Sequence, residues 1–224
     1  MATDTARLLL ALQHGDSAFP GGQFAFSWGL EGLAADGRLR GAAALSDFAA
    51  EQLHRRWASF DRVALRRAYD APDLDEISAI DADVERMTLV ATARAGSRQA
   101  GRSLLGVHAR LGAAGAADLR ARVAAGTTPG HLCVVQGAIG RGLGLDAATA
   151  EALSAWSLMS GLASAAVRLG LIGHLAAQAL LTRLGASVAD LLVQPPPAHM
   201  HAFTPLADIA MARHAGRDLR LFAT

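Results

Sequence analysis

The sequence has 224 residues, is 52% hydrophobic, 5% aromatic and 18% charged, and carries a net charge of +1. A single domain of this length buries roughly 70–75% of the surface of its unfolded chain, so folding requires no disulfide or metal. All 21 basic residues are arginines and Cys133 is the only cysteine, which excludes a Schiff-base or phosphate-loop lysine, an internal disulfide and a multi-cysteine zinc site.

Apolar residues recur at helical spacing along most of the chain. Alanine and leucine, which lose little side-chain entropy in a helix, dominate them. The stripes are Leu8, Leu9 and Leu12; Leu53, Trp57, Phe60 and Ala64; and Ile77, Ile80, Val84 and Met87. Turn-forming or small residues break the pattern at residues 14–23 and 113–116, and three prolines follow Gln194.

Helix starts are predicted from residues that commonly cap or open a helix. Ser and Asp side chains accept hydrogen bonds from the first free amides, and Pro suits the first helical position. The predicted starts lie at Ser46, Asp73, Thr128-Pro129, Asp146 and Thr204-Pro205.

These segments predict an all-α fold, a single-domain helical bundle of roughly eight to ten helices with a short C-terminal tail. Residues 1–194 would form the bundle. Residues 195–224 would add a proline-rich linker, a short helix and a C-terminal docking tail, within the same domain or as an appendage.

The N-terminus and the most apolar region indicate a protein without a membrane span. Residues 1–7 are polar and lack the basic start and apolar core of a secretory signal. Residues 152–181 are interrupted by Arg168, His174 and Gln178, and a central arginine costs about 2.5–3.5 kcal/mol on insertion scales. We therefore expect buried core helices in this region.

No pattern of residues predicts a catalytic, cofactor or metal site, so we expect no enzyme. His199-Met200-His201 is the only close histidine pair, and it could bind nickel or zinc weakly with a third ligand; a solvated linker is the favoured interpretation. Gly140, Gly142 and Gly144 lack the spacing and the preceding strand of a dinucleotide loop, and favour close helix packing instead.

Two rows of arginines leave several interpretations open. Arg94, Arg98 and Arg102 share one helical face, where they could pair with carboxylates of the same chain, with an acidic partner or with phosphates. The second row consists of Arg55, Arg56, Arg62, Arg66 and Arg67. Pairing within the chain is the favoured explanation. A helical nucleic-acid-binding regulator remains the alternative, although no aromatic residues are interleaved and the net charge is near zero.

Four segments, in order, resemble the urease accessory protein family UreF. Residues 16–31 contain an acid, Phe19-Pro20, two glycines and a Gly29-Leu30-Glu31 ending. The other segments are residues 94–105, residues 131–178 and the C-terminal residues 205–222. Together they span nearly the whole chain, and their order and the two ends make the match specific.

The chain departs from the family pattern at several positions. The glycine pair is shifted to Gly21-Gly22, and Thr224 replaces a terminal serine. Alanines replace acids that the pattern leads one to expect, at Ala95, Ala176 and Ala215. These losses would weaken particular partner contacts, or mark a diverged copy without urease partners.

The resemblance implies a cytoplasmic all-α chaperone that forms a homodimer and assists nickel insertion into urease. Its implied partners are the accessory protein UreD (also called UreH), the nickel-carrying GTPase UreG and the urease apoprotein, without membrane contact. In the tail, Arg220, Leu221 and Phe222 would contact a partner, as would Arg213 and His214, since arginine and aromatic residues are frequent interface hot spots. In the N-terminal segment, Phe24, Phe26, Trp28 and Glu31 would form a second interface if exposed, or pack the fold if buried.

Overall fold

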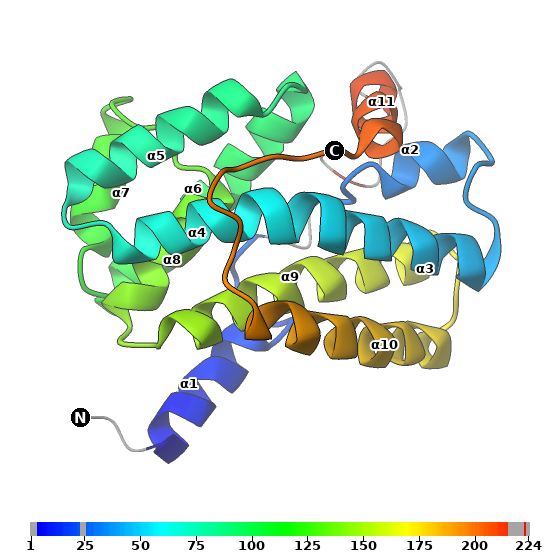
Figure 1. Cartoon of the computed structure of the whole chain (residues 1–224), viewed down its shortest axis with the longest axis horizontal. Coiled ribbons are helices and arrows are strands. Elements are labelled where there is room, and N and C mark those ends of the chain that lie inside the picture. The colour runs from blue at the N-terminus through cyan, green and yellow to red at the C-terminus, as the bar shows by residue number, and fades with distance from the viewer. Residues whose placement is uncertain (1–3, 23–25, 215–221, 223–224) are drawn as a thin grey trace.

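The computed structural model describes residues 4–22, 26–214 and 222. In these ranges the chain forms helices and no strand, which confirms the all-α prediction (Figure 1). The elements are α1 (Asp4–Gly15), α2 (Leu30–Ala35), α3 (Gly41–Gln52), η2 (Leu53–Asp61), α4 (Arg62–Asp70), α5 (Leu74–Met87), α6 (Ala91–Leu111), α7 (Ala116–Ala124), α8 (Leu132–Gly142), α9 (Ala147–Arg168), α10 (His174–Val193) and α11 (Pro205–His214).

The longest helix runs without interruption from Gly41 to Asp70 and contains a π-helical segment. Its α-helical ends, α3 and α4, flank η2, where the wider turn is marked by a hydrogen bond from the Arg62 amide to the carbonyl of Trp57, five residues earlier. The predicted stripe of Leu53, Trp57, Phe60 and Ala64 is fully buried along it. π-Helical segments of this kind often occur at functional positions.

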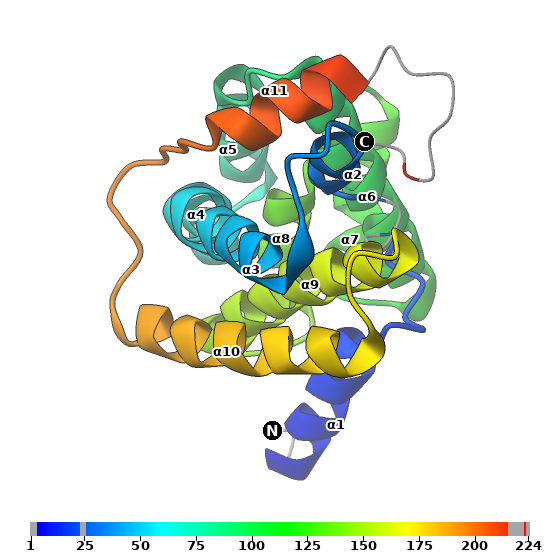
Figure 2. The ribbon, with the colours of Figure 1, turned by 90° about the vertical axis from the view of Figure 1, so that its right-hand side faces the viewer.

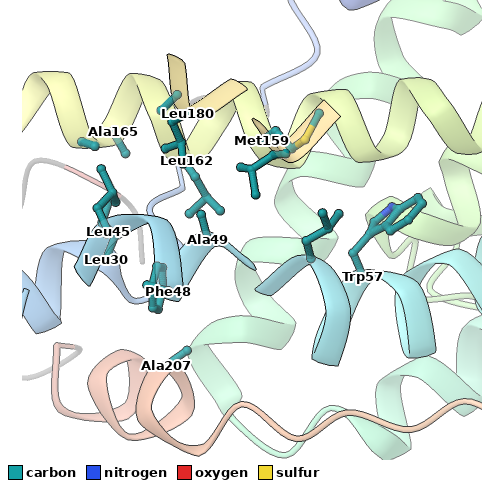
Figure 3. Packing of buried hydrophobic residues seen from close by; sticks show 14 of the residues in the cluster. Leu30, Leu45, Phe48, Ala49, Trp57, Met159, Leu162, Ala165, Leu180 and Ala207 are labelled. Atoms are coloured by element: carbon teal, nitrogen blue, oxygen red, sulfur yellow. The ribbon is translucent and has the colours of Figure 1, made fainter. Parts of the chain in front are cut away.

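The helices enclose two hydrophobic clusters. One lies between α2, α3, α9, α10 and α11, and includes Trp57, Met159 and Leu162 (Figure 3). The other lies between α4, α5, α6, α7 and α8, with α8 packed between α4 and α6. Because alanine and glycine are frequent at these crossings, the helices approach one another closely.

Glycines on α8 allow the closest of these approaches. A Cβ at Gly137 would lie 2.2 Å from the carbonyl oxygen of Leu65, and one at Gly140 would lie 2.7 Å from the Ala150 methyl group. A Cβ at Gly142 would lie 2.3 Å from the Ala114 carbonyl oxygen. The predicted packing role is therefore confirmed for Gly140 and Gly142, whereas Gly144 has a left-handed φ of 70° and forms a turn.

Three of the predicted helix starts are confirmed. The Asp73 carboxylate accepts the amides of Asp75 and Glu76, and Asp146 accepts the amide of Thr149. Pro205 is the first residue of α11.

The other two predicted starts are wrong, since tertiary contacts decide them. Ser46 lies inside α3, which begins five residues earlier at Gly41. Thr128 precedes α8 by four residues, because its buried hydroxyl donates to the Asp81 carboxylate (2.8 Å) and holds the loop before the helix.

The apolar region after residue 152 forms α9 and much of α10, which pack against each other. By length and composition, α10 is the only described helix that could cross a membrane. A helix of a folded bundle passes the same test, and α10 buries Leu180, Leu184 and Val188 against α9 and α3.

Candidate protein-interaction surfaces

The linker between α10 and α11 is fastened along the long helix. The amides of His201 and Phe203 donate to the carbonyls of Ser59 (2.9 Å) and Arg55 (3.0 Å), both in η2. The linker crosses the helix as an extended segment without secondary structure (Figure 1, orange). Met200 is buried while His199 and His201 are exposed, so the linker is held in place and both imidazoles face solvent.

A buried ion pair fixes the point where this linker begins. The Arg62 guanidinium donates to the carboxylate of Glu151 (2.8 Å), with 4% and 1% of the two side chains exposed. Its other two nitrogens donate to the carbonyls of Leu191 and Gln194, each at 2.8 Å. A second arginine, Arg66, pairs with the same carboxylate at 2.7 Å. One guanidinium therefore joins α4, α9 and the end of α10.

Helix α11 sits on α2 by backbone contact and turns an apolar face outward. A Cβ at Gly29 or Gly32 would lie 2.9 Å from the carbonyl oxygen of Ala207 or Ala210, so only glycine fits at these two positions. Two large apolar side chains of the helix are exposed, those of Leu206 (47%) and Ile209 (50%), and Phe203 (66%), just before the helix, is exposed as well. Arg213, one turn further along, is also exposed.

The tail folds back onto its own chain at Phe222. This residue is 5% exposed, its amide donates to the Glu31 carboxylate (3.2 Å), and the Arg168 guanidinium stacks 4.2 Å from its ring centre. Arg220 and Leu221 lie outside the described residues, as does the side chain of His214. The partner contacts expected of the tail thus stay a prediction, and Phe222 is placed as an anchor.

The N-terminal segment is mostly packed inside the fold. Phe26 is 2% exposed, Glu31 is buried, and Trp28 is half-buried with a positive φ of 53°. The rings of Phe26 and Trp28 lie 6.4 Å apart. Phe24 lies outside the described residues. The packing interpretation therefore describes Phe26 and Glu31, whereas the side chain of Trp28 is partly accessible.

A second apolar surface, which sequence reasoning missed, lies at the opposite end of the molecule (Figure 2). Leu8, Leu9 and Leu12 on α1 are 59–61% exposed, and Trp156 on α9 is 38% exposed. Leu12 and Trp156 line a groove of about 670 Å³ between α1, α9 and α10. The leucine stripe was the signal, but periodicity alone does not distinguish a core face from an uncovered one.

Most arginines of the two rows pair with carboxylates of the same chain. Glu85 accepts from Arg94 (3.3 Å) and Arg98 (3.2 Å), which explains why Arg94 needs no acid at the exposed Ala95. In the second row, the pairs are Arg56–Asp61, Arg62–Glu151, Arg66–Glu151 and Arg67–Asp83. Pairing within the chain is thus confirmed for these residues.

The best-connected polar cluster is internal. His131 is fully buried, with Nδ1 3.1 Å from the Ser97 hydroxyl and Nε2 2.8 Å from the Glu85 carboxylate. Burial lowers the pKa of His131. Asp81, also buried, accepts hydrogen bonds from the Thr128 hydroxyl and from the backbone amides of Gly130 and His131. Both clusters hold the loop before α8, and no group of three or more His, Cys, Asp or Glu suited to a metal occurs among the described residues.

The sequence of this chain is similar to proteins of one known family. The UreF family model matches residues 39–185. The urease accessory protein UreF of Trichodesmium erythraeum is 31% identical to this chain, with 99% of this chain and 98% of the relative covered. The UreF of Mesorhizobium japonicum is 33% identical, with 92% and 91% covered, and that of Allorhizobium ampelinum is 32% identical, with 99% and 98% covered. The chain therefore belongs to the UreF family of urease accessory proteins.

Proposed function

We propose that this chain is a cytoplasmic scaffold of urease maturation, without enzymatic activity, that forms a homodimer, binds UreD (UreH) and recruits the nickel-carrying GTPase UreG to the urease apoprotein. The observation that carries the proposal is a pair of exposed apolar surfaces at opposite ends of a member of the UreF family. Apolar patches of this kind commonly mark protein interfaces. Because the two surfaces are far apart, both can be occupied at once.

The α1 surface is suited to a second copy of the same chain. Its groove is lined by small and apolar residues apart from Asp16 and Thr149; Leu12 of α1 is one of them, and Leu8 and Leu9 of the same helix are exposed. A two-fold dimer brings a surface against itself, so the leucines of each copy can enter the groove of the other. A stable interface of this kind buries about 800 Å² per subunit.

Self-association is tested by placing charge on α1. We expect the double variant Leu9→Glu/Leu12→Glu to behave as a monomer of 23.1 kDa by light scattering during size exclusion, while the unaltered protein has twice that mass. Leu111→Glu is the matched control, because Leu111 is as exposed as Leu12 (61%) but lies at the end of α6. A dimer that survives both charges would place the interface elsewhere.

We assign binding of UreD and UreG to the C-terminal arm and the N-terminal segment beside it. Leu206 and Ile209 would enter the partner, with Arg213, His214, Arg220 and Leu221 providing further contacts. Phe24 and the accessible edge of Trp28 would extend this surface. Phe222, Phe26 and Glu31, which are buried, would act by holding the tail and α2 in position.

Complex formation is the direct test of the scaffold. The purified protein is mixed with its cognate UreD and UreG in the presence of nucleotide, and the mass is measured by light scattering. We expect one species that contains all three proteins, and expect Leu206→Glu/Ile209→Glu to lose UreD while remaining dimeric; Leu111→Glu again serves as the control. Separate elution of three folded components would refute the proposal and favour the nucleic-acid or diverged-protein alternatives.

The scaffold would act by raising local concentration. Two modules held on one dimer meet at an effective concentration set by geometry, which increases transfer between them without any new chemistry. The pairing of most arginines within the chain agrees with this passive role.

A further inference from the structure

A cluster of three aromatic rings, two of them stacked imidazoles, joins α1 to the bundle. His14 near the end of α1 lies parallel to His108 of α6, with ring centres 4.9 Å apart and an angle of 11°. Phe19, from the loop after α1, lies 4.7 Å from His14 and 5.4 Å from His108. Apart from this cluster, a hydrogen bond from the Trp156 indole to the Gly15 carbonyl (2.8 Å) fastens the same end of the helix to α9.

Both imidazoles carry a buried nitrogen without a hydrogen-bond partner among the described residues, Nε2 of His14 and Nδ1 of His108. Nδ1 of His14 lies 2.7 Å from the Leu10 carbonyl and so must carry its proton. An imidazolium carries a hydrogen on each nitrogen, so either ring in its charged form holds an N–H that has no acceptor among the described residues. Buried polar groups rarely lack a hydrogen-bond partner, and the free-energy cost is largest when the group is charged.

The cavity that both rings line holds no counter-ion for an imidazolium among the described residues. The rings line a cavity of about 50 Å³ whose other polar side chains, Gln136 of α8 and Ser154 and Ser157 of α9, are neutral. Asp16 of the adjoining loop borders a neighbouring cavity with His14, and its carboxylate accepts the amide of Ala18. Burial, with His14 as a second cause, lowers the pKa of His108 to about 4.

We propose that this cluster of His14, Phe19 and His108 is a proton-sensitive joint that holds α1 on the bundle at neutral pH and releases it on acidification. When α1 leaves, water reaches His108 and its pKa returns toward the ordinary value of about 6.5. The released form therefore binds protons more tightly than the docked form. Docking is strongest above pH 6.5 and weakens as the pH falls from 6.5 toward 4.

The test is amide hydrogen exchange of residues 8–14, corrected for the intrinsic effect of pH. Relative to pH 7.5, we expect the protection of α1 to fall about tenfold at pH 5.5 and about 30-fold at pH 5.0, given pKa values of about 4 docked and 6.5 released. His108→Phe keeps a ring in the cluster but takes no proton, so its protection should not change with pH. Constant protection in the unaltered protein, or an equal loss in His108→Phe, would overturn the joint.

A second measurement needs no variant and decides the matter if His108→Phe does not fold. In an NMR titration of the unaltered protein, His108 should titrate well below the ordinary histidine range, and α1 resonances should shift with it. A His108 that titrates near pH 6.5 with α1 still docked refutes the proposal.

The joint rests on the proposed function only in its consequence for the dimer. Because α1 carries Leu8, Leu9 and Leu12, its release should dissociate the dimer in acid, and the measured mass should fall toward that of the monomer. A protein that is monomeric at pH 7.5 refutes the dimer and leaves the joint standing, whereas pH-independent protection refutes the joint whatever the mass.

Discussion

Replacing Gly101 with alanine is expected to lower the free energy of unfolding by about 3 kcal/mol, the upper end of the usual cost of overpacking. The new Cβ would lie 2.0 Å from the carbonyl oxygen of Gly130 and 3.0 Å from the carbonyl carbon of His131. These atoms belong to the backbone of the loop that the buried Asp81 carboxylate holds through three hydrogen bonds. Because the loop cannot move without breaking them, α6 must shift. Urea unfolding followed by circular dichroism measures the loss.

The same helix provides its own control at Gly106. A Cβ there would have no neighbour within 4 Å, so Gly106→Ala should gain only the helix propensity of alanine, about 0.5–1 kcal/mol of added stability. Both changes add one methyl group to the interior of α6, and their difference isolates the contact with Gly130. Equal stability of the two variants would show that the loop yields at little cost.

Local signals predicted much of this fold. The stripe from Leu53 to Ala64 is buried as its spacing required, and Asp73 and Asp146 cap their helices with the hydrogen bonds that aspartate is chosen for. The information needed lies within about one helical turn of each residue. The UreF resemblance rests on the order of four sequence segments along the chain, and recognising it requires no tertiary contact.

Features that depend on distant residues could not be predicted in this way. Thr128 has the sequence of a helix cap, but its hydroxyl is taken by Asp81, 47 residues away in the sequence. Phe222 has the appearance of an exposed anchor, yet Glu31 and Arg168 enclose it. In such cases a residue from a distant part of the chain decides the role of the side chain. The pattern of a single segment carries no information about that residue.

Removing the carboxylate of Glu151 is expected to be as damaging as any single change in the chain. Glu151→Leu keeps most of the side-chain volume but leaves the Arg62 guanidinium, 4% exposed, without its counter-ion. Breaking one partner of a buried pair costs about 3–5 kcal/mol, since the remaining charge stays desolvated. Arg66 is 33% exposed and can turn toward solvent, so the loss falls mainly on Arg62. Chemical unfolding measures it.

The double variant Arg62→Met/Glu151→Leu separates charge from architecture. Replacing a whole buried ion pair by apolar groups of similar size is often close to neutral, so global stability should recover. The hydrogen bonds from Arg62 to the carbonyls of Leu191 and Gln194 are nevertheless lost, which frees the start of the linker. We therefore expect faster amide exchange in residues 198–204 and weaker binding of UreD despite the restored stability. Arg67→Ala removes an exposed ion pair instead. It should change the free energies of unfolding and of UreD binding by no more than about 1 kcal/mol each. Intact binding by the double variant would show that the arm needs no fastening at Arg62.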